Sequence, residues 1–342
     1  MTNTAAQGTA PSETAPSETA PSGTAPLGIV VTGVSRAFGT VHAVRDATLR
    51  VPPGSVTALI GPNGSGKTTL LLMLATLLAP DTGTITVAGH NPATNPEAVR
   101  ATMGWMPDAL GSWPTLSVRA ALEVTGRMYQ MTRTAAVARA AELITITGLE
   151  PLANQPSRVL SRGQKQRLSL ARALVHDPSV LLLDEPASGL DPAARASLRE
   201  LVRRLAGEGK AVLISSHVLA ELDEMADAAV YLSEGETATQ DQIARAGASA
   251  RAWRIRSLDA ALLANALAAS GVTPGSTSVD NLGTLLQVQN EAAAADLLAK
   301  LVTAGVPVCD FGPAVGDLEH TFLDLTKASA RTRPAPSGEA SA

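Results

Sequence analysis

The chain has 342 residues, of which 45% are hydrophobic and 17% are charged, so it can build more than one packed domain. The net charge of -4 excludes a generally basic surface of the kind that binds nucleic acid. The single cysteine, Cys309, excludes an internal disulfide and a zinc site made of cysteines.

The amino-terminal segment repeats a five-residue unit. Residues 9–26 read TAPSETAPSETAPSGTAP, and a segment so rich in proline, serine and threonine cannot bury apolar surface. We therefore expect residues 1–27 to be a disordered tail, and residues 331–342 to be a second one. The start lacks a basic stretch followed by an apolar one, so no signal peptide is expected.

Ordered sequence is expected from Gly28, where strands and helices begin to alternate. The runs IVVTGV, ATLRV and VTALI indicate strands, a helix is expected to reach Leu78, and TITVAG indicates a further strand. Residues 93–155 have a mostly helical pattern. From Ser179 the order is strand, helix, strand, with VLLL, residues 192–206 and AVLIS. Such alternation predicts an α/β fold with a mainly parallel sheet that helices cover on both faces.

A small α+β domain is predicted over residues 246–330. RAWRIRS, LGTLLQVQ and VPVCDF indicate strands, and DAALLANALAAS, EAAAADLLAKLVTAG and VGDLEHTFLDLT indicate helices. Leu318, Phe322 and Leu325 form an apolar stripe on the last helix, which is enough to dock it. The longest apolar run, residues 70–79, is half of the roughly 20 residues that a membrane span needs.

A phosphate-binding loop is predicted at GPNGSGKT, which fits the pattern G-x-x-x-x-G-K-[ST]. Glycines let backbone N–H groups point at phosphate oxygens, and the helix that follows adds the positive end of its dipole. A chance match in a glycine-rich turn is the alternative, but a strand before the loop and a helix after it are what the mechanism demands. The expected nucleotide contacts are Gly61, Pro62, Asn63, Gly64, Ser65, Gly66, Lys67, Thr68 and Thr69.

Two acids directly follow the most apolar predicted strand, in VLLLDEPASGLD. A buried charge is costly unless something compensates it, and a metal ion would compensate Asp184. We expect Mg²⁺ to be bound by Thr68 and Asp184. Neighbouring strand residues point to opposite sides, so Glu185 can face a water and act as its general base. The alternative for Glu185 is a solvated turn residue before Pro186.

Two helix starts carry capping signals. In LSRGQKQRLSLARAL, Ser161 and Gln164 have the spacing of a capping box, and the free N–H groups there offer a second anion site. Asp191, followed by Pro192 and an apolar stripe, predicts a second N-cap. The structural alternative at Ser161 is only a well-capped helix.

Taken together, the motifs resemble those of an ATP-binding cassette (ABC) ATPase. GPNGSGKT is similar to the Walker A loop, LSRGQ to the signature motif, LLLDEP to the Walker B strand, SGLD to the D-loop and SSH to the segment of the switch histidine, His217. All five occur in the family's order. The resemblance implies a P-loop NTPase cassette over residues 28–245, with a mainly parallel core, an antiparallel β subdomain and a helical subdomain at about residues 93–175.

The resemblance also implies roles for single residues. Phe38 would stack on adenine, although plain core packing is the alternative for it. Glu185 would polarise the attacking water and His217 would contact the γ-phosphate. In this family the signature motif faces the Walker A loop of a second copy, so Ser161 and Gly163 would complete the partner's ATP site. Gln164 and, as a D-loop contact compatible with its N-cap role, Asp191 are further nucleotide-binding candidates.

Two positions depart from the family's pattern. Asp108 stands in GWMPDAL where the family has its Q-loop glutamine, and it could still bind Mg²⁺ or the attacking water, so it remains a catalytic and metal candidate. Arg162 stands in the signature where glycine is commoner. It could add positive charge near the nucleotide or simply be exposed. Neither change removes the base, so ATP hydrolysis is still expected.

The resemblance is strongest to exporter-type subunits of bacterial transporters that are encoded apart from their permease. It implies an ATPase that works with a separate transmembrane permease and a second copy of itself, peripheral on the cytoplasmic face of the membrane, with no nucleic acid. The segment GSWPTLSVRAALE would contact the permease, with Trp113 and Leu116 as contact candidates for which core packing is the alternative. Two alternatives remain: a soluble ABC ATPase acting on ribosomes or DNA, and a non-hydrolysing ATP-gated clamp.

Overall fold

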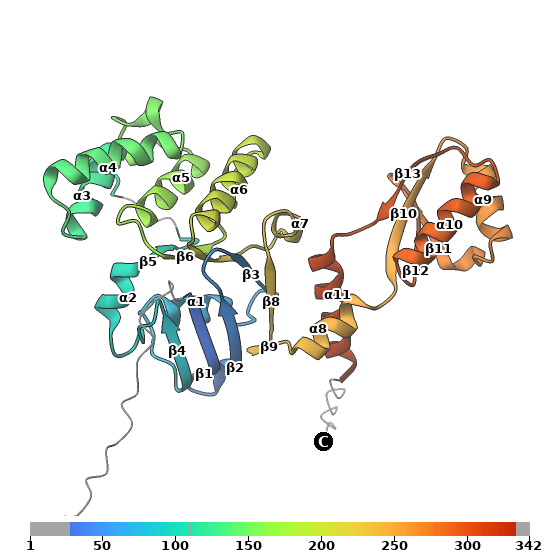
Figure 1. The fold of residues 1–342 in the computed structure, drawn as a ribbon, viewed down its shortest axis with the longest axis horizontal. Coiled ribbons are helices and arrows are strands. Elements are labelled where there is room, and N and C mark those ends of the chain that lie inside the picture. Colours follow the sequence, from blue (N-terminus) through green and yellow to red (C-terminus); the bar gives the residue numbers. More distant parts are fainter. Residues whose placement is uncertain (1–27, 110, 112, 333–342) are drawn as a thin grey trace, which may run out of the picture.

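A computed structural model describes residues 28–109, 111 and 113–332 of the chain (Figure 1). The expected amino-terminal tail and residues 333–342 of the second tail lie outside the described residues. The second tail was expected from Arg331, but Arg331 and Thr332 are still helical.

A nine-stranded sheet forms the centre, with the strand order β4-β1-β2-β9-β8-β3-β7-β6-β5. Strands β3, β5, β6, β7 and β8 pair in parallel in one part of it. Every residue of β3, β6 and β7 is buried, as expected for strands covered on both faces. The bounds of these five strands are Val56–Ile60, Met103–Met106, Val180–Asp184, Ala211–Ser215 and Ala228–Ser233.

The other part of the large sheet is antiparallel. β1 pairs with both β2 and β4, and the short β9 connects this part to β8. The mainly parallel core with an antiparallel extension that the sequence predicts is thus confirmed. The bounds are Ile29–Phe38 for β1, Val41–Val51 for β2, Thr82–Val87 for β4 and Glu236–Thr237 for β9.

Two cores form because the side chains of β3 alternate between the faces of the sheet. Val56, Ala58 and Ile60 pack with α3 to α6 on one face, whereas Leu59 packs with α1 and the antiparallel strands on the other. The helices of this part and their bounds are α1 Lys67–Leu74, α2 Pro96–Thr102, α3 Val118–Met128, α4 Arg133–Ile146, α5 Arg162–Ala173, α6 Pro192–Gly207 and α7 Leu219–Asp223, with short 3₁₀ turns at Glu150–Leu152 and Ser157–Val159.

Two expectations for this part were wrong in detail. The first helix ends at Leu74 rather than Leu78, and Thr76 has a left-handed φ of 66°, which a helix cannot continue through. Residues 93–155, where a mostly helical pattern was expected, hold α2, α3 and α4, but Met103–Met106 form the unexpected edge strand β5, which pairs with β6. Four residues are too few for a period of two to stand out from a helical pattern.

The carboxyl-terminal part forms a separate four-stranded antiparallel sheet, with the order β11-β12-β10-β13. The chain order β-α-β-β-α-β and this strand order make a split βαβ unit of the ferredoxin-like kind. The predicted α+β arrangement is present, and only β11 was not expected. The bounds are β10 Arg251–Ser257, α9 Ala260–Ala269, a 3₁₀ turn Pro274–Ser276, β11 Thr277–Asp280, β12 Gly283–Val288, α10 Glu291–Thr303 and β13 Val308–Pro313.

The last helix, α11 (Asp317–Thr332), leaves the small sheet and returns to the large one. It packs against α7 and α8 (Gln240–Gly247), as Figure 1 also shows. Leu318, Phe322 and Leu325 pack against the core of the large sheet, so the predicted docking stripe is confirmed.

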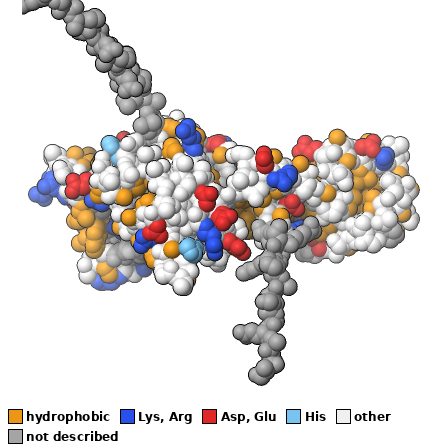
Figure 2. All heavy atoms as spheres, turned by 90° about the horizontal axis from the view of Figure 1, so that it is seen from below, with side chains coloured by type: hydrophobic (Ala, Val, Ile, Leu, Met, Phe, Trp, Pro, Cys, Tyr) orange, Lys and Arg blue, Asp and Glu red, His pale blue; other side chains and the backbone are white. Residues whose placement is uncertain are grey.

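The surface seen in Figure 2 carries acidic and basic side chains intermixed, so this face has no broad basic patch. Hydrophobic side chains gather toward the end of the molecule where α2 and α3 lie. Among the helices of the described residues, none combines the length and the apolar character that crossing a membrane requires.

Candidate nucleotide site

The phosphate loop connects β3 to α1 in a conformation that depends on its glycines. Gly64 and Gly66 have φ values of 80° and 104°. A Cβ atom at Gly66 would lie 2.3 Å from the carbonyl oxygen of Ala43, and one at Gly61 would lie 2.2 Å from that of Leu232. The buried Ser65 hydroxyl has no hydrogen-bond partner among the described residues. The backbone thus packs too tightly here for larger residues, as a phosphate cradle requires.

Lys67 begins α1 and folds back over the loop. Its Nζ donates to the carbonyl oxygens of Gly61 at 2.7 Å and Pro62 at 3.0 Å. Burial lowers the pKa of Lys67, and the charges of Glu185 and Asp184 oppose that shift. The ammonium group is therefore partly desolvated, and an anionic ligand would compensate its buried positive charge.

Asp184, the last residue of β6, is 8% exposed. Its Oδ1 accepts a 2.6 Å hydrogen bond from the hydroxyl of Ser215, at the end of β7. Burial raises the pKa of Asp184, and the negative charges of Glu185 and Asp108 add to that rise. Sequence reasoning missed Ser215, although it stands two residues before His217 in the SSH motif.

Glu185 directly follows β6 and has a left-handed φ of 51°. Hydrogen bonds of its backbone with Ser215 and Gln166 hold this conformation. Its N–H donates to the Ser215 carbonyl and hydroxyl oxygens, each at 3.2 Å, and its carbonyl accepts from Nε2 of Gln166 at 2.7 Å. The Glu185 carboxylate lies 2.6 Å from Nδ1 of His217. Because an ionised carboxylate only accepts, Nδ1 carries the proton and donates. The base candidate and the predicted switch histidine therefore form one unit.

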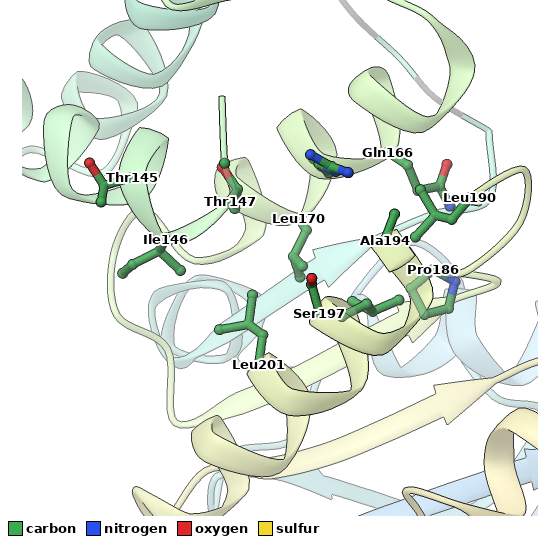
Figure 3. A pocket seen from close by; sticks show the side chains of 13 residues that line it. Thr145, Ile146, Thr147, Gln166, Leu170, Pro186, Leu190, Ala194, Ser197 and Leu201 are labelled. Carbon is green, nitrogen blue, oxygen red and sulfur yellow. The ribbon is translucent and has the colours of Figure 1, made fainter. Parts of the chain in front are cut away.

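A cavity of about 220 Å³ lies behind the loop that joins Glu185 to α6, between α5 and α6 (Figure 3). Gln166, which is 2% exposed, belongs to its wall, and Oε1 of Gln166 has no partner among the described residues. Pro186 and Leu190 from the loop line the same space. Gln166 therefore connects α5 to the backbone of Glu185, a contact that the sequence did not predict because nineteen residues separate the two.

The two predicted caps are confirmed. The Ser161 hydroxyl accepts from the Gln164 N–H at 3.2 Å, and Oε1 of Gln164 accepts from the Ser161 N–H at 2.9 Å. Asp191 caps α6 by accepting from Ala194 N–H at 2.9 Å, and this bond lowers the pKa of Asp191. Gly163 lies close to the loop before α6, because a Cβ there would be 3.1 Å from Cδ2 of Leu190.

The remaining candidates lie at two places. Asp108 follows β5, and its charge reaches Asp184. Phe38 ends β1 and is 47% exposed, with the guanidinium of Arg36 5.0 Å from its ring centroid. In the β1–β2 hairpin, Phe38 pairs with Val41 of β2. The same strand β2 contains Ala43, whose carbonyl oxygen faces Gly66 of the phosphate loop. One face of the ring already has a cation beside it.

The geometry as a whole is that of a ligand site at strand ends. The phosphate loop, Asp108 and His217 follow β3, β5 and β7, and Asp184 ends β6, so all lie at the carboxyl ends of neighbouring parallel strands. In open α/β sheets, ligands bind outside these ends. Thr68 is exposed in the first turn of α1 and Thr69 is half-buried there.

The residues also fit a magnesium ion that arrives with phosphates. The described residues contain no group of three or more His, Cys, Asp or Glu side chains that would form a metal cage. Mg²⁺ does not need one, since it keeps several waters and takes one or two carboxylates plus phosphate oxygens. Asp184 is a buried carboxylate with a raised pKa, and a bound cation would lower that pKa. The hydroxyl of Thr68 would be a second oxygen ligand.

Comparison with known proteins agrees with this geometry. A family model described as ABC transporter matches residues 44–188. The daunorubicin resistance ATP-binding protein DrrA3 of Streptomyces coeruleorubidus is 33% identical over 310 residues, 90% of this chain and 98% of that protein. The Nod factor export ATP-binding protein I of Burkholderia lata is 40% identical over 202 residues, 59% of this chain and 66% of that protein.

Two solved structures are similar as well. One is an ATP-binding subunit of an ABC transporter, with a TM-score of 0.59, 28% identity and coverage of 64% of this chain and 92% of the other. The second is the cassette MJ0796, a dimer in a post-hydrolysis state bound to ADP and Pi, with a TM-score of 0.57, 25% identity and coverage of 62% and 97%. The chain therefore belongs to the ABC transporter family, and it is an ATP-binding subunit that hydrolyses ATP.

Proposed function

We propose that this ATPase drives export through a separate membrane permease. The observation that carries the proposal is a groove of about 860 Å³ between the large sheet and the helices α2, α3 and α5, whose lining includes exposed hydrophobic side chains. Met128 is 69% exposed there, Leu77 57% and Tyr129 38%. Side chains of this size and exposure in one groove are typical of a protein contact.

The groove adjoins the nucleotide site, as an energy-coupling contact requires. Trp113 lines it, and the guanidinium of Arg172 lies 4.7 Å from the Trp113 ring centroid. Arg172 also donates to the carbonyl oxygen of Gly111, in the segment that follows Asp108. A partner in the groove would therefore touch the segment that joins β5 to α3. The predicted contact residue Leu116 is half-buried and belongs to the same segment.

The residues at the strand ends would divide the work of hydrolysis. Loop N–H groups and Lys67 would hold the β- and γ-phosphates. Glu185 would take the proton of the attacking water, and His217 would orient Glu185 while its other ring nitrogen faces the γ-phosphate. Mg²⁺, held by Thr68 and Asp184, would neutralise phosphate charge. Asp108 would contribute to the same ion or water, and Phe38 would stack on adenine with its free face.

Two copies would share each nucleotide. Ser161, Gly163 and Gln164 lie at the start of α5, where a partner's phosphates would bind the N–H groups that the Ser161–Gln164 capping box leaves free. Asp191 stands at the start of α6, which its own carboxylate caps, and it would contribute to the partner's site from there. The dimeric state of MJ0796 supports this arrangement. The cassette would span residues 28–245 and the accessory domain residues 246–330, with α11 docked back on the cassette.

The names of the relatives support export rather than another use of ATP. DrrA3 is named for resistance to daunorubicin and the Burkholderia lata protein for export of Nod factor. The protein would then be cytoplasmic and peripheral on the membrane. These names disfavour a ribosome- or DNA-acting ATPase, and no nucleic-acid partner is expected, since the net charge of the chain is -4.

A pull-down tests the proposal. Tagged Glu185→Gln protein, with ATP and Mg²⁺, is used as bait in detergent-solubilised native membranes. We expect a stoichiometric polytopic membrane protein, and we expect Met128→Glu in the groove to lose it. Leu258→Glu is the matched control, because Leu258 is 83% exposed in the carboxyl-terminal domain.

Two results would overturn the proposal. One is a soluble partner, such as ribosomes or DNA-bound proteins. The other is a membrane partner that the groove variant and the control retain equally, because the groove would then not be its binding surface.

A further inference from the structure

Arg162, the second residue of the signature loop, contacts two other loops of the same chain. Its Nη2 donates to the hydroxyl of Ser188 at 2.9 Å and lies 4.0 Å from Oδ1 of Asp108. Its side chain also lies on Gly189, where a Cβ would be 2.8 Å from Cδ of Arg162. One guanidinium thus joins the start of α5 to the loop before α6 and to the segment after β5.

The charges explain why such a contact would be needed. Asp184 ends β6, Glu185 follows it and Asp108 follows β5, and the negative charges of Glu185 and Asp108 are among the causes that raise the pKa of Asp184. A polyphosphate must approach these carboxylates, and an uncompensated one would repel it. The Nζ of Lys67 donates to a carbonyl oxygen of its own loop. Among the described ion pairs, the cation that lies beside Asp108 is Arg162.

We infer that Arg162 is a positioning residue for ATP hydrolysis, which acts by neutralising and orienting Asp108 while it holds the Ser188 loop against α5. The two residues that depart from the family's pattern carry opposite charges and lie together in space. They therefore act as a pair, and replacing one of them makes the other unfavourable.

The pair should act on turnover rather than on stability. The side chains of Arg162 and Asp108 are 62% and 54% exposed, and exposed ion pairs contribute little to folding. Their effect should appear when a nucleotide brings further negative charge to the site. This separates a positioning role from a structural one, because a structural residue would lower the melting temperature.

A double-mutant cycle tests the inference on the purified subunit without a permease, so its outcome does not depend on the transport proposal. The proteins are wild type, Arg162→Gln, Asp108→Asn and the double variant. We expect Arg162→Gln to lower kcat about tenfold in the wild-type background but less than about twofold in the Asp108→Asn background, within the range of coupling between contacting residues. We expect Arg162→Lys, which keeps the charge, to recover most of the loss.

The controls fix the interpretation. Melting temperatures of all four proteins should agree, and the nearby exposed Arg158→Gln should leave kcat unchanged. Equal losses of kcat from Arg162→Gln in both backgrounds would overturn the inference, because Arg162 would then act independently of Asp108. A lowered melting temperature that parallels the loss of kcat would also overturn it, because it would make Arg162 structural.

Discussion

Asp184 and Glu185 are neighbours in the chain, but their surroundings assign them different chemistry. Asp184 is buried beside Ser215, and nothing but Lys67 among the causes of its pKa shift supplies positive charge. Glu185 is held by backbone bonds and a histidine, with its carboxylate at the edge of the site. Asp184 therefore has no ion-pair partner among the described residues and is suited to bind a cation, whereas Glu185 is placed to take a proton from a water.

Glu185→Gln should abolish most ATP turnover while ATP binding persists, because it removes the base and keeps the shape. General bases contribute about 10²- to 10⁴-fold, so we expect kcat to fall by about 10²-fold or more. Phosphate release measures turnover, and binding of a fluorescent ATP analogue measures affinity. Glu208→Gln, on the exposed end of α6, is the control. Turnover within about threefold of wild type would contradict the role of Glu185.

Asp184→Asn should stabilise the nucleotide-free protein at neutral pH. Because folding raises the pKa of Asp184, the folded state binds its proton more tightly than the unfolded chain does. Wild-type stability is therefore lost as pH rises above the unfolded value, 3.8, and the neutral amide avoids this loss. We expect a melting temperature about 2 °C higher at pH 7.5, with the difference disappearing as pH falls through the raised pKa towards 3.8.

Asp177→Asn is the control of opposite sign. A hydrogen bond from Lys210 lowers the pKa of Asp177, so its charge stabilises the fold above the unfolded pKa, and the amide should lower the melting temperature at pH 7.5. A melting temperature of Asp184→Asn below that of wild type at every pH from about 5 to 8 would show that the buried carboxylate stabilises the empty site.

At the scale of elements, local pattern predicted most of the fold. VTALI, AVLIS and RAWRIRS became strands with the expected bounds, because a continuous or alternating apolar run carries its own signal. The four-residue edge strand β5 was missed, since its burial comes from pairing with β6. The caps at Ser161 and Asp191 were predictable because capping is local.

Contacts within the site were less predictable than its members. The motifs named Glu185 and His217 separately, but their 2.6 Å contact depends on β6 and β7 being neighbours. Ser215, Gln166 and the Arg162–Asp108 pair likewise depend on tertiary packing. Sequence patterns identify chemical groups, whereas strand order decides which groups meet.

Phe322→Ala should loosen α11 from the large sheet. Phe322 packs with Leu318 and Leu325 against that core, and the Leu318 N–H donates to Asp223 at 2.8 Å. Since Phe322 is only partly buried, we expect a loss of about 1–3 kcal/mol in the free energy of unfolding, below the cost at a fully buried site. Urea denaturation measures it. Leu323→Ala, on a side chain that is 41% exposed, should cost much less, and equal losses would contradict docking through the stripe.

At the scale of the whole molecule, the arrangement of motifs makes each nucleotide site depend on two chains. Lys67 and Ser161 stand at the starts of α1 and α5. In a twofold dimer each site would take its Lys67 from one copy and its Ser161 from the other. Lys67 can therefore be substituted in one chain and Ser161 in another, and mixing the two variants tests whether the sites are shared between chains.

Lys67→Ala and Ser161→Arg should each be inactive alone, because every site of either homodimer contains the lesion. In a mixed dimer one site combines an intact Lys67 with an intact Ser161, and the other contains both lesions. Equal mixing makes half of the dimers mixed, so independent sites would recover about a quarter of wild-type turnover. The measurement is phosphate release from the mixture, compared with each variant alone at the same total concentration.

The control is the double variant Lys67→Ala/Ser161→Arg mixed with wild type, in which the intact partners stand in the same chain. Its mixed dimers pair a damaged residue with an intact one at both sites, so they should add nothing to the activity of the wild-type homodimers. About a quarter of wild-type turnover from each mixture, which in the control comes from the wild-type homodimers alone, would require composite sites. Activity of the second mixture equal to half that of undiluted wild type, with none from the first, would mean that each chain completes its own site.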